Sequence, residues 1–375
     1  MSVLHKMTED ILYLSKSSST DYRSCDHSPM PSISEQAKRV GRLTEYKANR
    51  PACCLVDHPA HVQALMSRSE IARILSECLD DVTTRSGIPA STPRFVVVKS
   101  NELPQIQRLA DTAPFTFPMI VKPLPAAGTK ASHHMMVVLN RQGLRRVHFP
   151  CILQEYENHG GVLFKVYVLG DTVRVFPRNS LPNLPRGEQG CSGHPGYVEF
   201  DSQRPYPRLA DFGLPSEQDQ WKAQMRQPAV ENCQRNPVCP TDQAQRTDTS
   251  AKKRRVTVQN GPRPDTNTNT NASPRKTSWH NRNAGGLANS KLVTADEIRP
   301  IATALRRSFQ LELFGFDILV TENDATGERT MVVVDVNYFP SYKEVSSFPS
   351  LLAQYLTQRA VEGRIQSVAA SKCTS

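Results

Sequence analysis

The stretch "VVVDVNYFP", residues 332–340, ends an apolar run with an acid and an amide two positions apart. Successive side chains of a β-strand alternate between its two faces, so Asp335 and Asn337 share one face and Val336 points to the other. A carboxylate and an amide oxygen on one face are suitable ligands for a hard cation. The alternative is a strand that simply runs into a turn, because Asp and Asn are common turn formers.

A second strand lies directly upstream. The apolar segment "LFGFDILVTE", 313–322, is separated from the first by the polar, Gly-containing "NDATGER", which predicts a hairpin. If the two strands pair antiparallel, Asp317 meets Asp335 and Asn337 at neighbouring positions. Two carboxylates and an amide oxygen, completed by water and phosphate oxygens, suit Mg²⁺. Taken alone, Asp317 is also compatible with a hydrogen-bonded structural acid.

Basic side chains recur on other predicted strands. Lys122 lies near the end of "FPMIVKPL", and Lys165 lies in the middle of "VLFKVYV". An unpaired buried ammonium group is costly, so Lys165 needs a partner, unless its long side chain reaches water. The loop "PLPAAGTKASHH" contains Gly128, where the backbone can approach a phosphate closely. Together with the acidic hairpin, these residues predict nucleotide phosphates held between lysines and Mg²⁺.

The composition narrows the class of protein. The chain has 375 residues, enough for two or three domains, with 28 prolines and a mean hydropathy of −0.47. Its net charge of +10 favours an anionic partner. The nine cysteines are scattered without a CxxC pair, which argues against a zinc site, and no RNA-binding aromatic signature is present. With neither a signal peptide nor an apolar run of about 18 residues, we expect a cytoplasmic protein that does not cross a membrane.

One long segment differs from the rest. Residues 215–290 are poor in apolar side chains, rich in Asn, Thr, Pro and basic groups, and without a period, so we expect disorder. The run Lys252–Arg255 within it is either a nuclear localisation patch or a solvated charge run. We therefore expect four regions: an N-terminal α/β region (1–85), the first part of a folded core (86–214), the insertion (215–290) and the acidic hairpin with a closing helix (291–375).

Periodicity predicts the remaining elements. Helices are expected at 61–82, 102–112, 295–309 and 347–363, where apolar residues recur at helical spacing. Strands are expected at 94–100, 117–124, 135–140 and 151–157. A further hairpin is expected over 162–178, with its turn at Gly170 and Asp171.

Several of these segments, in order, resemble the ATP-grasp fold and, within it, the inositol polyphosphate kinases called inositol-tetrakisphosphate 1-kinase or inositol 1,3,4-trisphosphate 5/6-kinase. The matching segments are "FPMIVKPL", "GTKASHHMMVV", "LQEYENHGGVLFKVYVLGD", "PRNSLPNL", "LFGFDILV" and "VVVDVNYFPSY". The resemblance covers about residues 1–12, 50–205 and 293–355. It implies two α+β subdomains that clamp ATP, behind a truncated N-terminal α/β domain.

The resemblance also implies roles for individual residues. The catalytic residues would be Lys165, His133 and Arg178. ATP would be bound by Lys122, Lys165, Gly128, Gln154, Glu155, Tyr156, Ser180 and Arg68, with 154–156 forming the adenine hinge. Mg²⁺ would be held by Asp317, Asp335 and Asn337. The inositol phosphate would be bound by Lys6, His133, His159, Arg178, Asn337 and Ser341.

The sequence departs from the family pattern in three places. Relatives normally carry a further strand–helix–strand unit ahead of the segment that begins "MSVLHK". Ala127 occupies a position where they often carry His or Asp, and Ser341 replaces a Gly whose backbone approaches the substrate. These departures bear on acceptor affinity and leave the ATP and Mg²⁺ groups intact.

The function implied by the resemblance is a Mg²⁺-dependent kinase that transfers the ATP γ-phosphate to a hydroxyl of inositol 3,4,5,6-tetrakisphosphate or inositol 1,3,4-trisphosphate. We expect a monomer whose partner is an inositol polyphosphate rather than nucleic acid. Two alternatives stay open, because one fold hosts many chemistries. One is an ATP- or inositol-phosphate-binding pseudokinase, and the other is an ATP-grasp carboxylate ligase.

Overall fold

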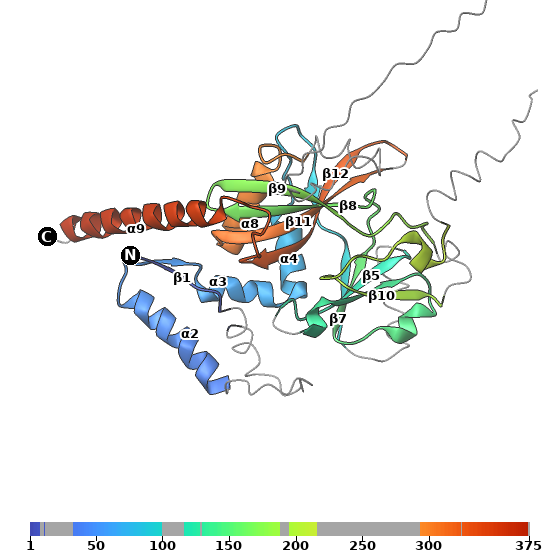
Figure 1. Cartoon of the computed structure of the whole chain (residues 1–375), viewed down its shortest axis with the longest axis horizontal. Coiled ribbons are helices and arrows are strands. Elements are labelled where there is room, and N and C mark those ends of the chain that lie inside the picture. Colours follow the sequence, from blue (N-terminus) through green and yellow to red (C-terminus); the bar gives the residue numbers. More distant parts are fainter. Residues whose placement is uncertain are drawn as a thin grey trace, which may run out of the picture. The chain divides into compact units, whose positions relative to one another are not determined.

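Two five-stranded sheets carry most of the elements expected from the sequence (Figure 1). The computed structural model describes residues 1–7, 11, 33–99, 116–127, 130–187, 195–215, 293–323 and 325–373. All of them belong to one compact unit, Met1–Asp219 with Asn283–Ser375. The helix expected at 102–112, Gly128, Lys252–Arg255 and nearly all of the segment 215–290 lie outside the described residues.

The first sheet is antiparallel throughout and has the order β10-β6-β5-β7-β4. Alternation along β5 sends Met119 and Val121 into a core with Met136 and Leu153, while Lys122 points to the opposite face. The short helices η3 (Lys130–His133) and η4 (Gly143–Arg146) lie between consecutive strands of this sheet, and η5 (Leu209–Phe212) follows β10. The strands are β4 (Phe95–Val98), β5 (Met119–Pro123), β6 (His134–Val138), β7 (Cys151–Glu155) and β10 (Tyr197–Asp201).

The second sheet has the order β3-β12-β11-β8-β9 and contains both predicted hairpins. All its neighbours are antiparallel except the pair β3–β12. The turn between β8 and β9 contains Gly170 at φ +57°, and a Cβ there would lie 2.6 Å from the Tyr355 ring, so glycine is required. The strands are β3 (Ala90–Ser91), β8 (Val162–Leu169), β9 (Thr172–Asn179), β11 (Leu313–Glu322) and β12 (Arg329–Tyr338).

Helix α8 (Arg299–Phe309) lies against the second sheet (Figure 1). Its apolar residues follow the 3.6-residue period, and Ile301, Leu305 and Phe309 are buried in one core with Phe316 of β11. Burial of each such side chain contributes roughly 1.5–3 kcal/mol to folding. The packing fixes the strand that carries Asp317.

The single helix expected over 61–82 is divided into α3 (Pro59–Gln63), η2 (Ala64–Met66) and α4 (Arg68–Cys78). The break falls at Ser67, whose backbone is extended at φ −126° and ψ 124°. Ser67 forms a β-bridge with Pro125, and the next main-chain N–H donates to the carbonyl of Leu124 at 2.8 Å. The expectation of a continuous helix was wrong because these long-range bonds compete with the helical ones.

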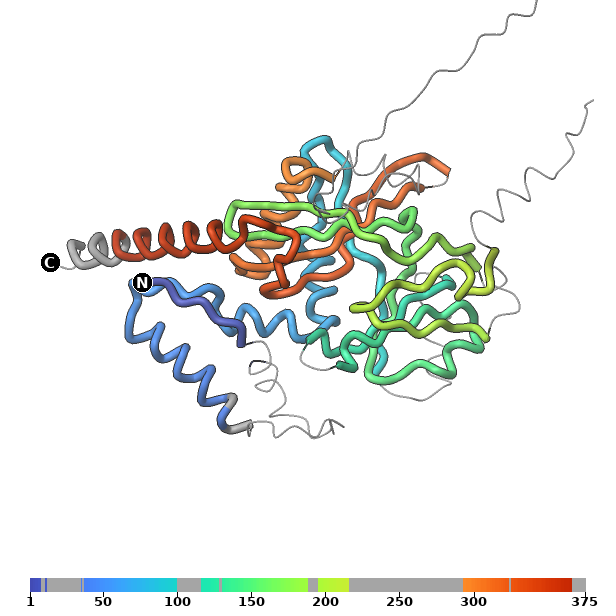
Figure 2. The backbone as a smooth tube through the Cα atoms, viewed as in Figure 1, coloured from blue at the N-terminus to red at the C-terminus, as the bar shows by residue number. Residues whose placement is uncertain are grey.

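The N-terminal region forms a small parallel sheet of β1 (Ser2–Leu4) and β2 (Cys54–Val56), which lie side by side in Figure 2. Helix α2 (Ile33–Ala48) comes between them in the sequence. The closing helix α9 (Phe348–Cys373) extends ten residues beyond the predicted end at 363. Among the described residues, no helix is long and apolar enough to span a membrane.

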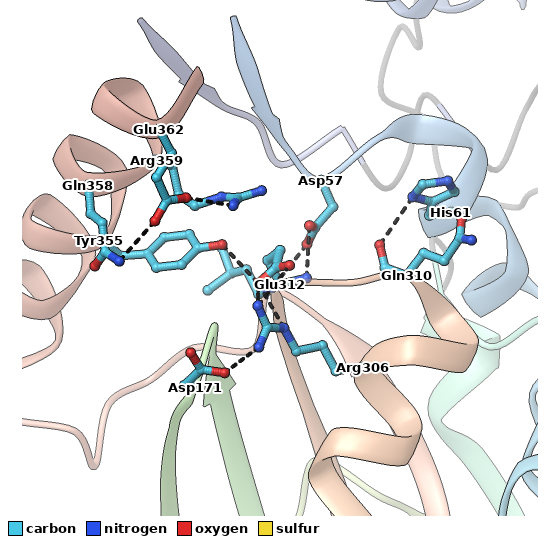
Figure 3. Close-up of polar contacts among 11 residues, drawn as sticks. Asp57, His61, Asp171, Arg306, Gln310, Glu312, Tyr355, Gln358, Arg359 and Glu362 are labelled. Carbon is cyan, nitrogen blue, oxygen red and sulfur yellow. Dashed lines mark hydrogen bonds and ion pairs between the residues drawn. The ribbon is translucent and has the colours of Figure 1, made fainter. Parts of the chain in front are cut away.

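A polar network fastens this N-terminal region to the start of β11 (Figure 3). The carboxylate of Asp57 accepts hydrogen bonds from the main-chain N–H groups of Glu312 (2.8 Å) and Leu313 (3.0 Å). The carboxylate of Glu312 in turn accepts a bond from Tyr355 of α9 at 2.9 Å and pairs with Arg306 of α8 at 2.7 Å. Burial raises the pKa of Asp57 to about 7. The network therefore couples the N-terminal segment to the strand that carries Asp317.

Candidate active site

Two carboxylates lie directly opposite each other where β11 pairs with β12. Asp317 is the register partner of Asp335, and the register shifts immediately afterwards, which leaves Val334 as the extra residue of a β-bulge. The side chain of Asn337 donates from Nδ2 to Oδ2 of Asp335 at 3.0 Å. The main-chain N–H of Val336 donates to the other carboxylate oxygen, also at 3.0 Å. The structure thus confirms the predicted hairpin and brings the three oxygen-bearing side chains together.

Lys165 faces this acidic group from the neighbouring strand. It is the register partner of Asp317 on β8, and its Nζ lies 3.2 Å from Oδ1 of that residue. Burial raises the pKa of Asp317, Lys165 lowers it, and the nearby carboxylate of Asp335 raises it again. Lys165 thus offsets part of the negative charge that the two carboxylates bring together. A pair of carboxylates on one face can also bind a hard cation.

The donor set fits a magnesium ion. Asp317 and Asp335 supply two carboxylates, and Asn337 uses its Nδ2 group for the bond to Asp335, so its amide oxygen is the atom to offer a metal. Carboxylate and amide oxygens are the ligands that Mg²⁺ takes, with water and phosphate oxygens completing its octahedron. Within the described ranges, no group of three or more His, Cys, Asp or Glu residues is placed to hold a metal ion. The carboxylate pair with Asn337 is therefore our candidate metal position.

A second lysine reaches the same place from the first sheet. Lys122 is buried, and its Nζ donates to the main-chain oxygen of Val334 at 3.0 Å. Burial lowers the pKa of Lys122 to about 8, whereas the carboxylates of Asp335 and Asp317 act in the opposite direction. The contact joins the two sheets beside the bulge. It brings a cation of the first sheet near the acids of the second.

Arg68 holds the ends of the loop that contains Gly128. Its buried guanidinium donates to the carbonyls of Pro123 (2.8 Å), Pro125 (2.7 Å) and Ser132 (2.8 Å). Burial lowers the pKa of Arg68, and the carboxylate of Asp335 raises it. Three main-chain acceptors on one guanidinium fix the loop on both sides of Gly128, so the described contacts of Arg68 are structural.

His133 lies at the end of η3 and contacts the turn after β10. Its ring nitrogens lie 3.5 Å from Oγ of Ser202 and 3.0 Å from Nε2 of Gln203. Together with Lys130 and Arg204 it lines a cavity of about 680 Å³. Burial lowers the pKa of His133, with Arg68 acting in the same direction, which favours the neutral ring.

The predicted adenine hinge links the two sheets and is held by an ion pair. Arg94, which lies between β3 and β4, donates to both carboxylate oxygens of Glu155 at 2.8 and 2.6 Å. The main-chain N–H of Glu155 donates to the carbonyl of Arg94 at 2.9 Å and is therefore committed. Tyr156 donates from its hydroxyl to the carbonyl of Pro182 at 2.6 Å. Gln154 is buried, and its side-chain oxygen has no partner in the described part of the chain.

The linker after the hinge is held by the loop that follows β9. The side-chain oxygen of Asn183 accepts bonds from the main-chain N–H groups of His159 (3.0 Å) and Gly160 (2.8 Å). His159 is buried, with Nδ1 2.7 Å from the carbonyl of Glu157, and burial lowers its pKa. Ser180 donates its main-chain N–H to the linker at Gly161. His159 is thus packed into the linker rather than exposed.

Arg178, at the end of β9, is met by an acid. Its guanidinium forms an ion pair with Glu344, and the hydroxyl of Tyr167 donates to the same carboxylate. A longer bond of 3.4 Å joins Arg178 to the Tyr167 hydroxyl. The charge of Arg178 lowers the pKa of Asp317, so the guanidinium lies beside the acidic centre.

The N-terminal segment approaches the end of β12. The ammonium group of Lys6 lies 5.2 Å from the centre of the Phe339 ring, a cation–π contact. Ser341 follows in an exposed turn, next to buried Tyr342, whose hydroxyl donates to the carbonyl of Val168 at 2.8 Å. Lys6 thus contacts the segment that follows Asn337, and Ser341 is part of that segment.

Sequence reasoning missed several residues of this site. Arg94 and Glu344 make the ion pairs described above, and Arg186 lies 3.6 Å from Glu155. Tyr206 is a fourth, because its pKa is raised to about 12 by burial and then by the charges of Asp317 and Asp335. The ion pairs of Arg94, Glu344 and Arg186 each join residues that are tens of positions or more apart in the sequence. No local spacing signals such a contact.

Comparison with known proteins gives a family match. The model described as "Inositol 1,3,4-trisphosphate 5/6-kinase ATP-grasp domain" matches residues 86–203 and 272–358, more than half of the chain. It covers Lys122, Lys165, Asp317, Asp335 and Asn337.

Individual relatives agree with that match. Inositol-tetrakisphosphate 1-kinase 1 of Zea mays is 27% identical over 84% of this chain and 70% of its own length. Inositol-tetrakisphosphate 1-kinase 5 of Oryza sativa subsp. japonica is 28% identical over 84% of this chain and 71% of its own. Among solved structures, the ATP-grasp ligase PsnB matches with a TM-score of 0.40 and 10% identity, over 88% of this chain and 69% of that one.

Proposed function

Because the chain belongs to the inositol 1,3,4-trisphosphate 5/6-kinase ATP-grasp family, a family of ATP-dependent inositol phosphate kinases, we propose that it is a Mg²⁺-dependent kinase of inositol 1,3,4-trisphosphate or inositol 3,4,5,6-tetrakisphosphate. The γ-phosphate of ATP is transferred to a ring hydroxyl. The observation that carries the proposal is the meeting of Asp317 and Asp335 with Lys165 and Lys122 from two sheets. Acids for a metal and lysines for phosphates are the groups that phosphoryl transfer requires.

Each residue has a distinct task in this proposal. Lys122 and Lys165 contact phosphate oxygens of ATP, and Lys165 stays near the transferred group because it is paired with Asp317. Asp317, Asp335 and Asn337 hold Mg²⁺, which when bound neutralises charge on the β- and γ-phosphates. Such transfer depends mainly on positioning and electrostatic stabilisation, so the site does not require a strong general base.

The acceptor meets the site from the side of Arg178 and His133. Arg178 lies beside the acidic centre and offers a planar guanidinium, which recognises phosphate through two parallel hydrogen bonds. His133 lines the 680 Å³ cavity and, as a neutral ring, is a hydrogen-bonding group rather than a charge. A ring that carries several phosphates uses both kinds of group.

The test is transfer of radiolabelled phosphate. Purified protein is given γ-labelled ATP, MgCl₂ and a panel of inositol phosphates, and label on the ring supports the kinase. ADP release that requires a carboxylate and an amine would instead indicate a ligase. Tight ATP binding without turnover would indicate a pseudokinase. Replacement of MgCl₂ by EDTA should abolish transfer, and full activity in EDTA would contradict the assigned metal requirement.

A further inference from the structure

The carboxylate of Glu344 lies against the guanidinium of Arg178, to which the proposed function assigns acceptor binding. Glu344 lies in the segment after β12, and its carboxylate forms an ion pair with Arg178 while accepting a bond from Tyr167. Tyr167 is almost fully buried, whereas the side chains of Arg178 and Glu344 are 43% and 31% exposed. The ion pair is therefore held by a buried hydroxyl group, while its own two side chains remain partly accessible to a ligand.

The pair lies on the same face as the phosphoryl-transfer groups. Lys165 and Tyr167 are two residues apart on β8 and share one face, and Arg178 is the register partner of Leu163 on that face. The charge of Arg178 is felt at Asp317, the carboxylate paired with Lys165. Through its contacts with Tyr167 and Arg178, Glu344 is thus held on the face of the second sheet that carries Lys165.

Carboxylate and phosphate compete for the same donors. The guanidinium of Arg binds either anion through its fork of N–H groups. In this structure one guanidinium nitrogen of Arg178, Nη2, already donates to Glu344, and the Tyr167 hydroxyl donates to the same carboxylate. A ring phosphate must displace this carboxylate or bind beside it against like-charge repulsion, which grows with the charge of the ligand.

We propose that Glu344 is an acceptor-specificity residue: it competes with a ring phosphate of the acceptor for Arg178 and so disfavours the more highly phosphorylated inositols. This inference rests on the proposed function. It assigns Glu344 a positioning role, because the carboxylate acts through Arg178 and takes no part in the transfer itself. Its removal should therefore change acceptor binding and leave the chemical step alone.

The experiment compares wild type with Glu344→Gln, which removes the charge and keeps a group that accepts the Tyr167 hydrogen bond. We expect the KM for inositol 1,3,4-trisphosphate to fall on the order of tenfold, and that for inositol 3,4,5,6-tetrakisphosphate to fall further, with kcat within about twofold. Glu322→Gln is the matched control, since it removes the acid of an ion pair with Arg329 at the hairpin end of β11 and β12. It should leave both KM values unchanged.

A double-mutant cycle with Arg178→Gln distinguishes competition from simple repulsion. If Glu344 acts by occupying Arg178, then Glu344→Gln gains nothing in the Arg178→Gln background. An equal gain in both backgrounds, or a KM that stays constant or rises in Glu344→Gln alone, overturns the proposal. If Glu344 is merely structural, Glu344→Gln lowers the melting temperature without lowering KM, and this result also overturns the proposal.

Direct binding separates this proposal from the proposed function. The dissociation constants of both inositol phosphates are measured by calorimetry with MgCl₂ and a non-hydrolysable ATP analogue. If no variant transfers phosphate, the kinase assignment fails, and tighter binding by Glu344→Gln still supports the competition. If wild type transfers phosphate and both variants bind equally, the kinase assignment stands and the role of Glu344 is refuted.

Discussion

Lys165 and Asp317 face each other across β8 and β11, with Nζ 3.2 Å from Oδ1. The same carboxylate lies opposite Asp335. In the proposed function these two acids bind magnesium. Changes to either residue should depend on whether magnesium is present.

Lys165→Met should reduce kcat on the order of 10²–10³-fold, because it removes a cation from the transferred phosphate. Without magnesium it should also lower the free energy of unfolding by about 1–3 kcal/mol, because Asp317 is left as a buried acid without its partner. Urea denaturation with and without MgCl₂ measures the second effect. Saturating MgCl₂ should reduce the loss of stability in Lys165→Met. The control Lys165→Arg, which keeps the positive charge, should lose little stability. A loss independent of MgCl₂ would argue against a metal beside Asp317.

Asp335→Asn should lower turnover by at least about 10²-fold, because the metal loses a charged ligand worth several kcal/mol in the transition state. Phosphate transfer and the rise in melting temperature on addition of MgCl₂ should disappear together. Asp80→Asn, in an exposed loop after α4, is the control for loss of one negative charge. Unchanged turnover in Asp335→Asn would show that the metal lies elsewhere.

Asp57 should make the protein less stable as the pH rises toward neutrality. Its pKa is raised from 3.8 to about 7 by burial, so between these values the folded state keeps a proton that the unfolded state has lost. Stability from this group is complete below pH 3.8 and is lost as the pH rises through about 7. Between pH 5 and 7, the unfolding free energy of wild type should therefore decline more steeply than that of Asp57→Asn, by about 1 kcal/mol per pH unit. Parallel pH profiles of the two proteins would contradict this assignment.

Arg94→Gln should destabilise the hinge because it leaves the buried carboxylate of Glu155 without its bidentate partner. We expect a loss of about 1–3 kcal/mol in urea denaturation and an increased KM for ATP. Arg73→Gln is the matched control, since Arg73 also donates to both oxygens of one carboxylate, that of Glu70, and to Glu77 as well, but at the exposed surface of α4. It should cost under about 1 kcal/mol. Equal losses of stability in Arg94→Gln and Arg73→Gln would show that the Arg94–Glu155 pair contributes no more than an exposed ion pair.

Gly315→Ala should disturb the segment that follows β12. A Cβ at this position would lie 2.8 Å from the carbonyl of Val166 and 2.9 Å from Pro340. We expect a stability loss of about 1–3 kcal/mol and a lower kcat, measured by urea denaturation and phosphate transfer. Gly41→Ala, within α2, has no atom within 4 Å of the added methyl group and should instead stabilise by about 0.5–1 kcal/mol. A Gly315→Ala protein as stable and active as wild type would contradict the expected clash.

The local sequence pattern was sufficient to predict the acidic hairpin. Alternation put Asp335 and Asn337 on one face, and the short polar connection implied that Asp317 would meet them, as the register shows. The same reasoning placed the β8–β9 turn at Gly170. In these cases the interacting residues are neighbours along one hairpin, so spacing alone fixes their geometry.

Long-range contacts were not accessible in this way. Glu344 is 166 residues from Arg178, and Arg94 is 61 residues from Glu155. Ser67 follows helical periodicity, yet its bridge to Pro125 ends the helix. Which of many charged or polar residues become partners depends on how separate elements pack, and one-dimensional periodicity carries no information about that.

The contact between Lys122 and the main-chain oxygen of Val334 has a consequence for how the kinase can vary. A carbonyl group is present whatever amino acid is encoded there, so substitutions at position 334 alter bulk and polarity without deleting the acceptor. The contact between the two sheets therefore depends on the lysine and on the bulge geometry, and not on the side chain at position 334. Two homologues can therefore share this lysine–carbonyl contact and have different amino acids at the position that supplies the carbonyl.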